Sequence, residues 1–415
     1  MNQLPLKSFN TAGPCNPTDH YMLPAIERIP TNIDGLISGK NYFVLHAPRQ
    51  SGKTTTIKSL VNKINHENKY YALYCSVESL EKIPNSFDSA PLITEKLIQF
   101  MLKSGIKKLI NACRGVSIFN PNNPSGLADN GKVPDEDYIT VSNSITSPLQ
   151  SVCQKLDKPL LIFIDEIDTL SGDVLVSCLR QLREGYIQRS EIPFPSSIAL
   201  IGMRNIRDYK ARIRPDSESL GTSSPFNIIK KAFTLANFTR EEVKTLYGQH
   251  TEETGQAFED GAVEQAMFWT DGQPWLVNAL ADDVIERQMV SVFTRPITSD
   301  HIDLAADRLK VDMNVHIDSL MARLQEPRVK RVMVPILTGA GPDGQASSLE
   351  DNQYCLDIGL IKKQPDGSHA PANRIYGDVI VRLLTWEFQN SLPMELEGRH
   401  VGPKGPEISD LLKDF

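Results

Sequence analysis

A run of small, polar and basic residues near the start of the chain has the spacing of a phosphate-binding loop. Its members, with the threonine that follows, are Ala47, Pro48, Arg49, Gln50, Ser51, Gly52, Lys53, Thr54 and Thr55. In such loops backbone N–H groups surround the β- and γ-phosphates, and Gly52 lets the chain approach them closely. Lys53 is placed to set a positive charge on those phosphates, and the Thr54 hydroxyl to bind Mg²⁺. Ala47 stands where the pattern has its first glycine, which is tolerable if its φ is negative.

Two consecutive carboxylates follow the apolar residues 160–164. Asp165 is placed to hold Mg²⁺ through water, and Glu166 to orient or deprotonate an attacking water. An acidic pair at the end of a strand can also cap the next helix, but its pairing with the phosphate loop favours catalysis. Asp168 is the weaker candidate, and capping of the following helix is its alternative role.

Several arginines are candidates for contact with the transferred phosphate. Arg204 and Asn205 follow the apolar residues 197–201, where related sheets place a residue that senses the γ-phosphate. The sequence does not choose between them. Arg180 and Arg183 are three residues apart on a predicted helix and share a face, so one of them is a candidate arginine finger toward a neighbouring subunit. A solvated or ion-paired face is the favoured alternative for this pair.

The elements around these residues alternate between strands and helices, which indicates a parallel α/β sheet. Strands are expected at 41–46, 70–75, 159–164 and 197–201, and helices at 54–64, 91–109 and 174–186. The continuous apolar run at 159–164 suits a sheet that helices cover on both faces. Residues 36–236 are therefore predicted to form a P-loop NTPase core, and residues 115–135 a surface insertion.

The sequence changes in character after residue 236. Thr239-Arg-Glu-Glu242 has the pattern of a capping box, and helical spacing continues to about residue 309. We expect an all-α lid at 237–310, a winged-helix-like domain at 311–398 and a tail at 399–415. The first 35 residues are expected to form an extended lead-in.

Composition narrows the class of protein. The chain has 415 residues, of which 40% are hydrophobic and 23% charged, an ordinary globular composition. A net charge of −7 argues against a protein whose surface is basic throughout and binds nucleic acid in that way. The six cysteines show no paired CxxC spacing, so reduced thiols and no zinc site are expected. Because neither a signal peptide nor an apolar run of about 18–20 residues is seen, a cytoplasmic protein without a membrane span is predicted.

Together these motifs resemble the bacterial AAA-like ATPases related to the STAND and archaeal-type P-loop ATPases. The resemblance extends over nearly the whole chain and rests on residues 9–15, 20–24, 47–55, 163–166, 179–183, 200–204, 224–227, 237–242 and 272–278. Gly272-Gln-Pro274 is similar to the lid motif of STAND proteins, which implies that Pro274 approaches the nucleotide. Gly-x-Pro also begins ordinary helices, because proline fits a first helical turn.

The resemblance implies a nucleotide-driven switch that uses ATP and Mg²⁺, with a homo-oligomer among its expected states. Many members of this group carry a PD-(D/E)xK nuclease domain after the winged helix, and no such motif is found at 311–415. A nuclease in trans is therefore one implied protein partner, and defence against mobile elements is a role by analogy only.

The same motifs are compatible with other functions. The chain is predicted to be an ATPase, but a nucleotide-binding adaptor with little hydrolysis, which recruits protein or DNA, would share its motifs. A DNA-associated motor or loader is a third reading, with a basic face on residues 311–400 as its expected mark. That region is close to neutral, so a protein partner is favoured over DNA. No Asn-Lys-x-Asp motif follows the strands, which favours ATP over GTP.

Overall fold

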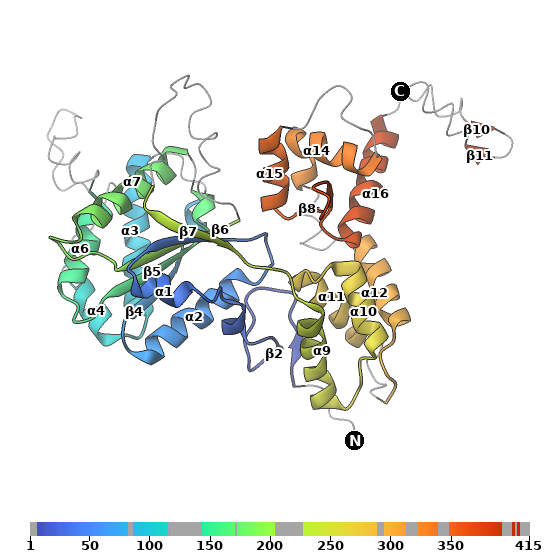
Figure 1. The fold of residues 1–415 in the computed structure, drawn as a ribbon, viewed down its shortest axis with the longest axis horizontal. Helices are drawn as coiled ribbons and strands as arrows, with labels where there is room; N and C mark the ends of the chain where they lie inside the picture. Colours follow the sequence, from blue (N-terminus) through green and yellow to red (C-terminus); the bar gives the residue numbers. More distant parts are fainter. Residues whose placement is uncertain are drawn as a thin grey trace.

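The computed structural model describes residues 6–81, 86–114, 116, 143–170, 172–203, 227–288, 294–312, 322–338, 348–391, 401–402 and 405–406. Within these residues an α/β core is followed by an all-helical lid and then by a small C-terminal unit of helices and a hairpin (Figure 1). The lid and the C-terminal unit lie next to each other, on the same side of the core. The predicted order of α/β core, helical lid and mixed C-terminal unit is therefore the observed one.

A five-stranded parallel sheet forms the centre of the core. Its strands are β3 (Tyr42–His46), β4 (Tyr71–Ser76), β5 (Leu160–Asp165), β6 (Ser197–Gly202) and β7 (Ile229–Thr234), in the spatial order β4-β5-β6-β3-β7. All residues of β5 and β6 are buried, as their continuous apolar runs predict. After β3 the chain crosses to the distant edge strand β4, and this change of direction creates a crevice at the carboxyl ends of the strands.

Helices cover both faces of the sheet because successive strand residues point to opposite sides. Phe43 and Leu45 of β3 pack with α1 (Ile33–Ser38) and α2 (Lys53–Glu67). Tyr42 and Val44 pack on the opposite face. The helices of that face are α3 (Ser86–Lys103), α4 (Lys107–Cys113), α6 (Thr146–Gln154) and α7 (Gly172–Gln188).

The lid contains α9 (Arg240–Thr254), α10 (Asp260–Thr270), α11 (Pro274–Asp283), a π-helical turn (Val284–Gln288) and α12 (Ser299–Val311). The capping box predicted at its start is confirmed. The Thr239 hydroxyl accepts the Glu242 N–H at 3.2 Å, and the Glu242 carboxylate accepts the Thr239 N–H at 2.7 Å. These bonds satisfy donors that the first turn of α9 would otherwise leave unpaired.

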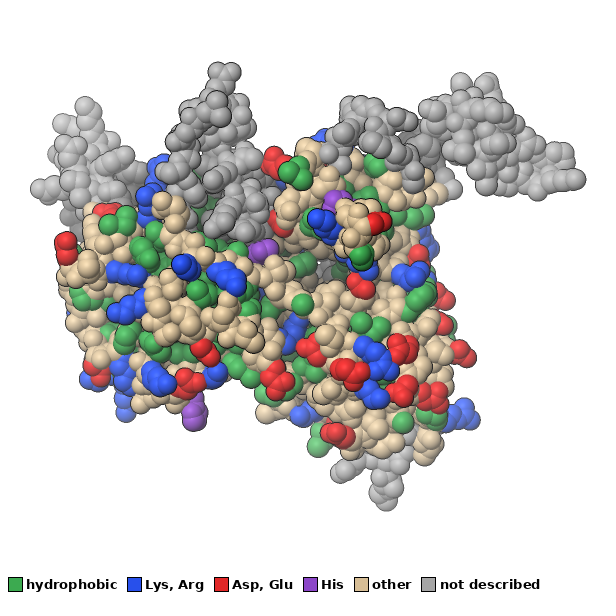
Figure 2. Space-filling model, in the orientation of Figure 1, with side chains coloured by type: hydrophobic (Ala, Val, Ile, Leu, Met, Phe, Trp, Pro, Cys, Tyr) green, Lys and Arg blue, Asp and Glu red, His purple; other side chains and the backbone are tan. Residues whose placement is uncertain are grey.

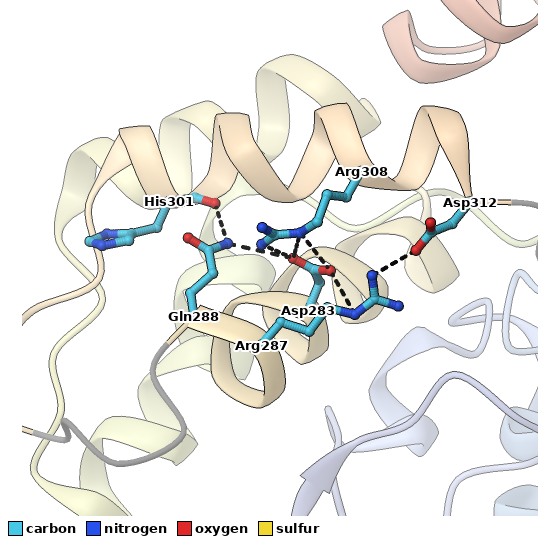
Figure 3. Close-up of polar contacts among 6 residues, drawn as sticks. All are labelled: Asp283, Arg287, Gln288, His301, Arg308 and Asp312. Atoms are coloured by element: carbon cyan, nitrogen blue, oxygen red, sulfur yellow. Dashed lines mark hydrogen bonds and ion pairs between the residues drawn. The ribbon is translucent and has the colours of Figure 1, made fainter.

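A buried carboxylate joins α11 to α12 (Figure 3). Asp283 is 8% exposed, and its two oxygens accept bonds from Arg308 Nε at 3.0 and 3.1 Å. Arg287, in the π-helical turn, lies 3.4 Å from the same carboxylate and donates to Asp312 at 2.7 Å. A buried carboxylate needs such partners, since an uncompensated one would strongly destabilise the fold. The end of α11 is therefore fixed to the C-terminal part of α12.

The C-terminal unit has the element content of a winged helix: α14 (Pro327–Thr338), α15 (Leu349–Asp357), the antiparallel strands β8 (Ile361–Lys363) and β9 (His369–Pro371), and α16 (Arg374–Ser391). The hairpin turns at Pro365-Asp366-Gly367, where Gly367 has a φ of 89°. A two-stranded pair, β10 (Val401–Gly402) with β11 (Gly405–Pro406), follows. One hydrophobic cluster runs through both the C-terminal unit and the lid.

The N-terminal segment packs against the lid. Its strands β1 (Ser8–Phe9) and β2 (His20–Tyr21) pair in parallel, and the 3-10 helix η1 (Ala25–Arg28) follows. The Phe9 ring lies 5.6 Å from that of Tyr247, and both belong to the cluster of the lid. The segment that leads into the core therefore also holds the lid.

Gly272 is the point at which backbone geometry restricts the lid most. Its φ is +71°, and a Cβ there would lie 1.9 Å from the Phe238 carbonyl oxygen. We expect Gly272→Ala to lower the free energy of unfolding by about 2–5 kcal/mol, since the left-handed backbone costs ~1–2 kcal/mol and the steric overlap ~1–3 kcal/mol. Gly255→Ala is the matched control, because Gly255 has a φ of +79° and open space around it. Equal losses for both variants in chemical denaturation would contradict this assignment.

Candidate functional site

The predicted phosphate loop lies between β3 and the first turn of α2. Gly52 has a φ of 85° at the N-cap of α2, and Gln50 is also left-handed with a φ of 58°. Since Gly52 has no side chain to cap the helix, the first N–H groups of α2 are left for a ligand, and a helix N-terminus favours an anion. Ala47 is fully buried and is not among the residues with positive φ, so alanine fits at this position.

Lys53 is turned back onto its own loop. Its ammonium donates to the carbonyl oxygens of Ala47 and Pro48, each at 2.7 Å, and the residue is 5% exposed. Burial lowers the pKa of Lys53, and the charges of Glu166, Asp165 and Asp168 oppose that change. Among the described residues, the direct partners of this buried cation are therefore backbone carbonyls of its own loop.

Asp165 and Thr54, the predicted pair of Mg²⁺ residues, are brought together. The Thr54 hydroxyl donates to Asp165 Oδ2 at 2.9 Å, and the Tyr74 hydroxyl donates to the same oxygen at 2.9 Å. Across the described part of the chain there is no cluster of three or more His, Cys, Asp or Glu that suits a metal ion. A hydroxyl with one carboxylate nevertheless fits Mg²⁺, which usually takes few protein ligands and completes its shell with phosphates and water.

Glu166 lies directly after β5, and its φ of 58° turns it away from the strand direction. It lines the same cavity as Lys53 and Thr54. Burial raises the pKa of Glu166 to about 7, and the nearby charges of Asp165 and Asp168 act in the same direction. A carboxyl group with a pKa near neutrality can exchange a proton with water, which is the property that a general base needs.

Asp168 holds the end of β6. Its Oδ2 accepts the Met203 N–H at 3.2 Å, and a Cβ on Gly202 would lie 2.6 Å from its Oδ1. The candidates Arg204 and Asn205 follow directly, but both lie outside the described residues. Asp168 thus orients the strand end from which the predicted phosphate sensor would extend.

Arg180 and Arg183 lie elsewhere. On α7 they line a shallow hollow of about 360 Å³ together with Glu184, Ile187 and Gln188. Neither arginine lines the cavity at the phosphate loop. Any contact of these side chains with a nucleotide would therefore require a second subunit.

The cavity beside the loop has a volume of about 420 Å³ and is bounded by the core, the lid and the N-terminal segment. Pro274, the predicted lid contact, is the first residue of α11 and lines this cavity with Trp275. Trp275 Nε1 donates to the Thr11 carbonyl at 2.8 Å, and the Cys15 N–H donates to the Thr55 hydroxyl at 3.1 Å. The N-terminal segment is thereby fixed to both the lid and α2.

Arg28 is a residue of this region that sequence reasoning missed. Its Nη1 donates to the Ser51 carbonyl at 3.1 Å, and its Nη2 donates to the Ala236 carbonyl at 2.6 Å. The guanidinium also lies over the Phe238 ring, 4.7 Å from its centroid. Arg28 therefore joins the phosphate loop to the connection between core and lid, and a single arginine in an irregular segment gives no sequence signal for such a role.

The C-terminal unit also contacts the phosphate loop, at Pro48. A Cβ on Gly359, which has a φ of +76°, would lie 2.6 Å from Pro48 Cβ. Lys362 forms an ion pair with Asp271 of the lid at 2.9 Å. A second cavity of about 250 Å³ lies beside this contact and is lined by residues of both the loop and the C-terminal unit. The turn between α15 and β8 therefore packs directly on the loop.

Comparison with solved structures finds several chains that are similar to this one. A Walker-type ATPase of Pyrococcus abyssi is 13% identical, with a TM-score of 0.59 over 90% of this chain and 99% of that chain. The RuvB Holliday junction branch migration motor of Thermotoga maritima is 15% identical, with a TM-score of 0.41 over 89% and 95%. The Orc1 protein of Aeropyrum pernix, solved in complex with DNA, is 12% identical, with a TM-score of 0.43 over 89% and 95%.

Two other comparisons gave no match: no protein-family model matches the chain, and neither does any curated protein. At these identities the structural likeness concerns the fold alone. The predicted fold class is thereby confirmed: the chain has a P-loop NTPase core followed by a helical lid and a winged-helix unit, the fold that it shares with the Walker-type ATPase of Pyrococcus abyssi.

The raised pKa of Glu166 predicts a pH-dependent stability. Below the ordinary value of 4.5 the carboxyl group is protonated in both the folded and unfolded states. As the pH rises from about 4.5 to about 7, the unfolded state is ionised before the folded state, so the folded state loses stability over this range and keeps the full loss at higher pH. We expect Glu166→Gln, which cannot ionise, to gain up to about 2 kcal/mol over the parent between about pH 5 and pH 8, after allowance for partial solvent screening.

Chemical denaturation at several pH values measures this difference. Glu81→Gln is the control, because Glu81 is an exposed glutamate outside the cavity. A difference between Glu166→Gln and the parent that does not change with pH would show that the carboxyl of Glu166 is not buried as described.

Proposed function

We propose that this chain is a switch ATPase, which binds and hydrolyses Mg²⁺-ATP and thereby changes the arrangement of its lid and C-terminal unit. The observation that carries this proposal is the convergence of Lys53, the Thr54–Asp165 pair and Glu166 on one cavity at the carboxyl ends of the parallel strands. In open α/β sheets ligands bind at this edge, where the strand order changes direction. The proposed division is a core at 36–236, a lid at 237–310, a winged helix at 311–398 and a tail at 399–415.

Each residue has a role that follows from its position. The N–H groups from Gln50 to Thr54 surround the phosphates, and the Lys53 ammonium moves from backbone carbonyls to phosphate oxygens. Thr54 and Asp165 hold Mg²⁺, which neutralises phosphate charge when it is bound. Glu166 accepts a proton from the attacking water. Arg204, directly after the strand end that Asp168 holds, is the proposed sensor of the γ-phosphate.

The switch rests on contacts between the loop and the other units. Gln273 Nε2 donates to the Gln50 carbonyl at 3.4 Å, just before Pro274 begins α11. Asp283 fixes the other end of α11 to α12 (Figure 3), and Lys310 of α12 pairs with Asp378 of α16 at 3.2 Å. A change at the loop can therefore shift α11 and the C-terminal unit together, provided that ATP binds one arrangement better than the other.

The proposed partners are a homo-oligomer and another protein, with a nuclease in trans as one case, ahead of DNA. On the face in Figure 2, Lys and Arg side chains of the lid stand among Asp and Glu. Ion pairs of the lid include Lys244–Asp260 and Arg240–Glu264. Such mixed charge does not suit a DNA backbone. No described helix is long and apolar enough to span a membrane. A cytoplasmic, STAND-like role in defence against mobile elements is the process that we propose.

A second candidate function is a nucleotide-binding adaptor with little hydrolysis. The pKa of about 7 favours it, because about half of the Glu166 side chains are then protonated at neutral pH and cannot accept a proton from water before the nucleotide binds. Measurement of hydrolysis in the parent chain separates the two functions, since the adaptor binds ATP without turnover.

We expect Lys53→Ala to weaken ATP binding by about 30-fold or more, since loss of one partner from a buried charge pair costs ~2–5 kcal/mol. Lys63→Ala is the control, because Lys63 lies on the same helix in exposed ion pairs with Asp34 and Glu67. Titration calorimetry with Mg²⁺ and a non-hydrolysable ATP analogue measures both variants. Unchanged affinity in Lys53→Ala would refute the assigned phosphate site.

We expect Glu166→Gln to bind ATP normally and to lose most of its hydrolysis. Glutamine keeps the size and hydrogen-bonding reach of the side chain but cannot accept the proton of water, and loss of a general base lowers rates by ~10²–10⁴-fold. Phosphate release under single-turnover conditions is the measurement. If this variant and the parent hydrolyse ATP at equal rates, Glu166 is not the base.

A further inference from the structure

We propose that Tyr74 is a positioning residue for the magnesium site: its hydroxyl fixes the Asp165 carboxylate so that Oδ1, and not Oδ2, faces the metal shell. This assignment rests on the proposed function, because it requires Mg²⁺-ATP at the phosphate loop. It adds a residue of the edge strand β4 to a site otherwise built from α2 and β5.

The bonds around Asp165 lead to this assignment. Oδ2 accepts the hydroxyls of Thr54 and Tyr74, each at 2.9 Å, and Oδ1 accepts the Glu166 N–H at 3.0 Å. Each carboxylate oxygen offers about two lone-pair directions. Both directions of Oδ2 are therefore in use, whereas Oδ1 has only one bond from the described residues. Its second direction is left for another donor, such as a water bound to Mg²⁺.

Contacts of the Tyr74 backbone and ring restrict the position of its hydroxyl. Its backbone is paired with Phe163 of β5, two residues before Asp165. The Lys58 ammonium lies 5.1 Å from the centroid of its ring, and Phe100 meets the ring edge-on at 6.2 Å. These contacts come from α2 and α3, so the ring is held by helices on two sides. A side chain that donates a hydrogen bond to a metal ligand orients that ligand and tunes its affinity for the metal.

Without the Tyr74 hydroxyl, Oδ2 would keep one free direction, and the carboxylate could turn either oxygen to the metal. The ring would remain in place, since its contacts with Lys58 and Phe100 do not involve the hydroxyl. Tyr74→Phe therefore tests the hydrogen bond and leaves the packing of β4 unchanged.

Tyr71 provides a matched control on the same strand. Its hydroxyl donates to Asp157 Oδ1 at 2.8 Å, beside the start of β5 and at the opposite end of the sheet from the phosphate loop. Tyr71→Phe therefore makes the same chemical change, the loss of one tyrosine–aspartate bond of β4, away from the site. Any general effect on the stability of the strand should occur in both variants.

The experiment is a titration with MgCl₂ at a fixed concentration of a fluorescent, non-hydrolysable ATP analogue, with the Mg²⁺ concentration at half-maximal binding as its readout. We expect Tyr74→Phe to require about 10-fold more Mg²⁺ than the parent, the lower end of the effect of such partners on metal affinity. Affinity for the analogue in EDTA should not change, and Tyr71→Phe should match the parent in both measurements.

A half-maximal Mg²⁺ concentration in Tyr74→Phe equal to that of the parent would overturn the assignment and leave the proposed function intact. Equal losses in Tyr74→Phe and Tyr71→Phe would also overturn it, because the effect would then belong to the strand. If the parent itself binds the analogue without any dependence on Mg²⁺, the proposed function fails, and the role of Tyr74 fails with it.

Discussion

The position of the Lys53 ammonium is the constraint on which the rest of the site depends. It is almost completely buried, and among the described residues no carboxylate lies within ion-pair distance of it; its direct partners are the carbonyls of Ala47 and Pro48. Burial of a charge with so little compensation is costly. In the proposed function a polyphosphate supplies the missing negative charge, at the place that the loop, the crevice and the start of α2 surround.

Pro48 contacts both the Lys53 ammonium and the C-terminal unit. Its carbonyl accepts a bond from Lys53, and its ring is in contact with Gly359 of the C-terminal unit. In the proposed switch, phosphate draws Lys53 away from that carbonyl, so the surface on which the C-terminal unit is docked changes. Arg28 adds a second connection, since it binds the carbonyl of Ser51 and the chain that leads into the lid. Nucleotide charge thus acts on both outer units through backbone atoms of one loop.

The sequence was sufficient where chemistry fixes residue types at short spacing. The phosphate loop from Ala47 to Thr54 and the strand that ends at Asp165 are of this kind, and their apolar flanks predicted the parallel sheet. The capping box at Thr239 was also predictable, because its bonds are local. Other features depend on contacts between distant segments: Arg28 reaches the loop, and Tyr74 reaches Asp165, only after the chain has folded. The pKa of Glu166 likewise results from burial, which spacing does not reveal.

Hydrogen exchange of the full chain, with and without a saturating non-hydrolysable ATP analogue and Mg²⁺, tests the central claim most directly. The claim is that occupancy of the loop changes the docking of the C-terminal unit. The account predicts increased protection in residues 47–56 and, at the same ligand concentration, altered protection in residues 349–363, the segment whose Gly359 packs on Pro48. Protection that changes at the loop while residues 349–363 and the lid exchange as before would contradict it, because the site would then bind nucleotide within a static scaffold.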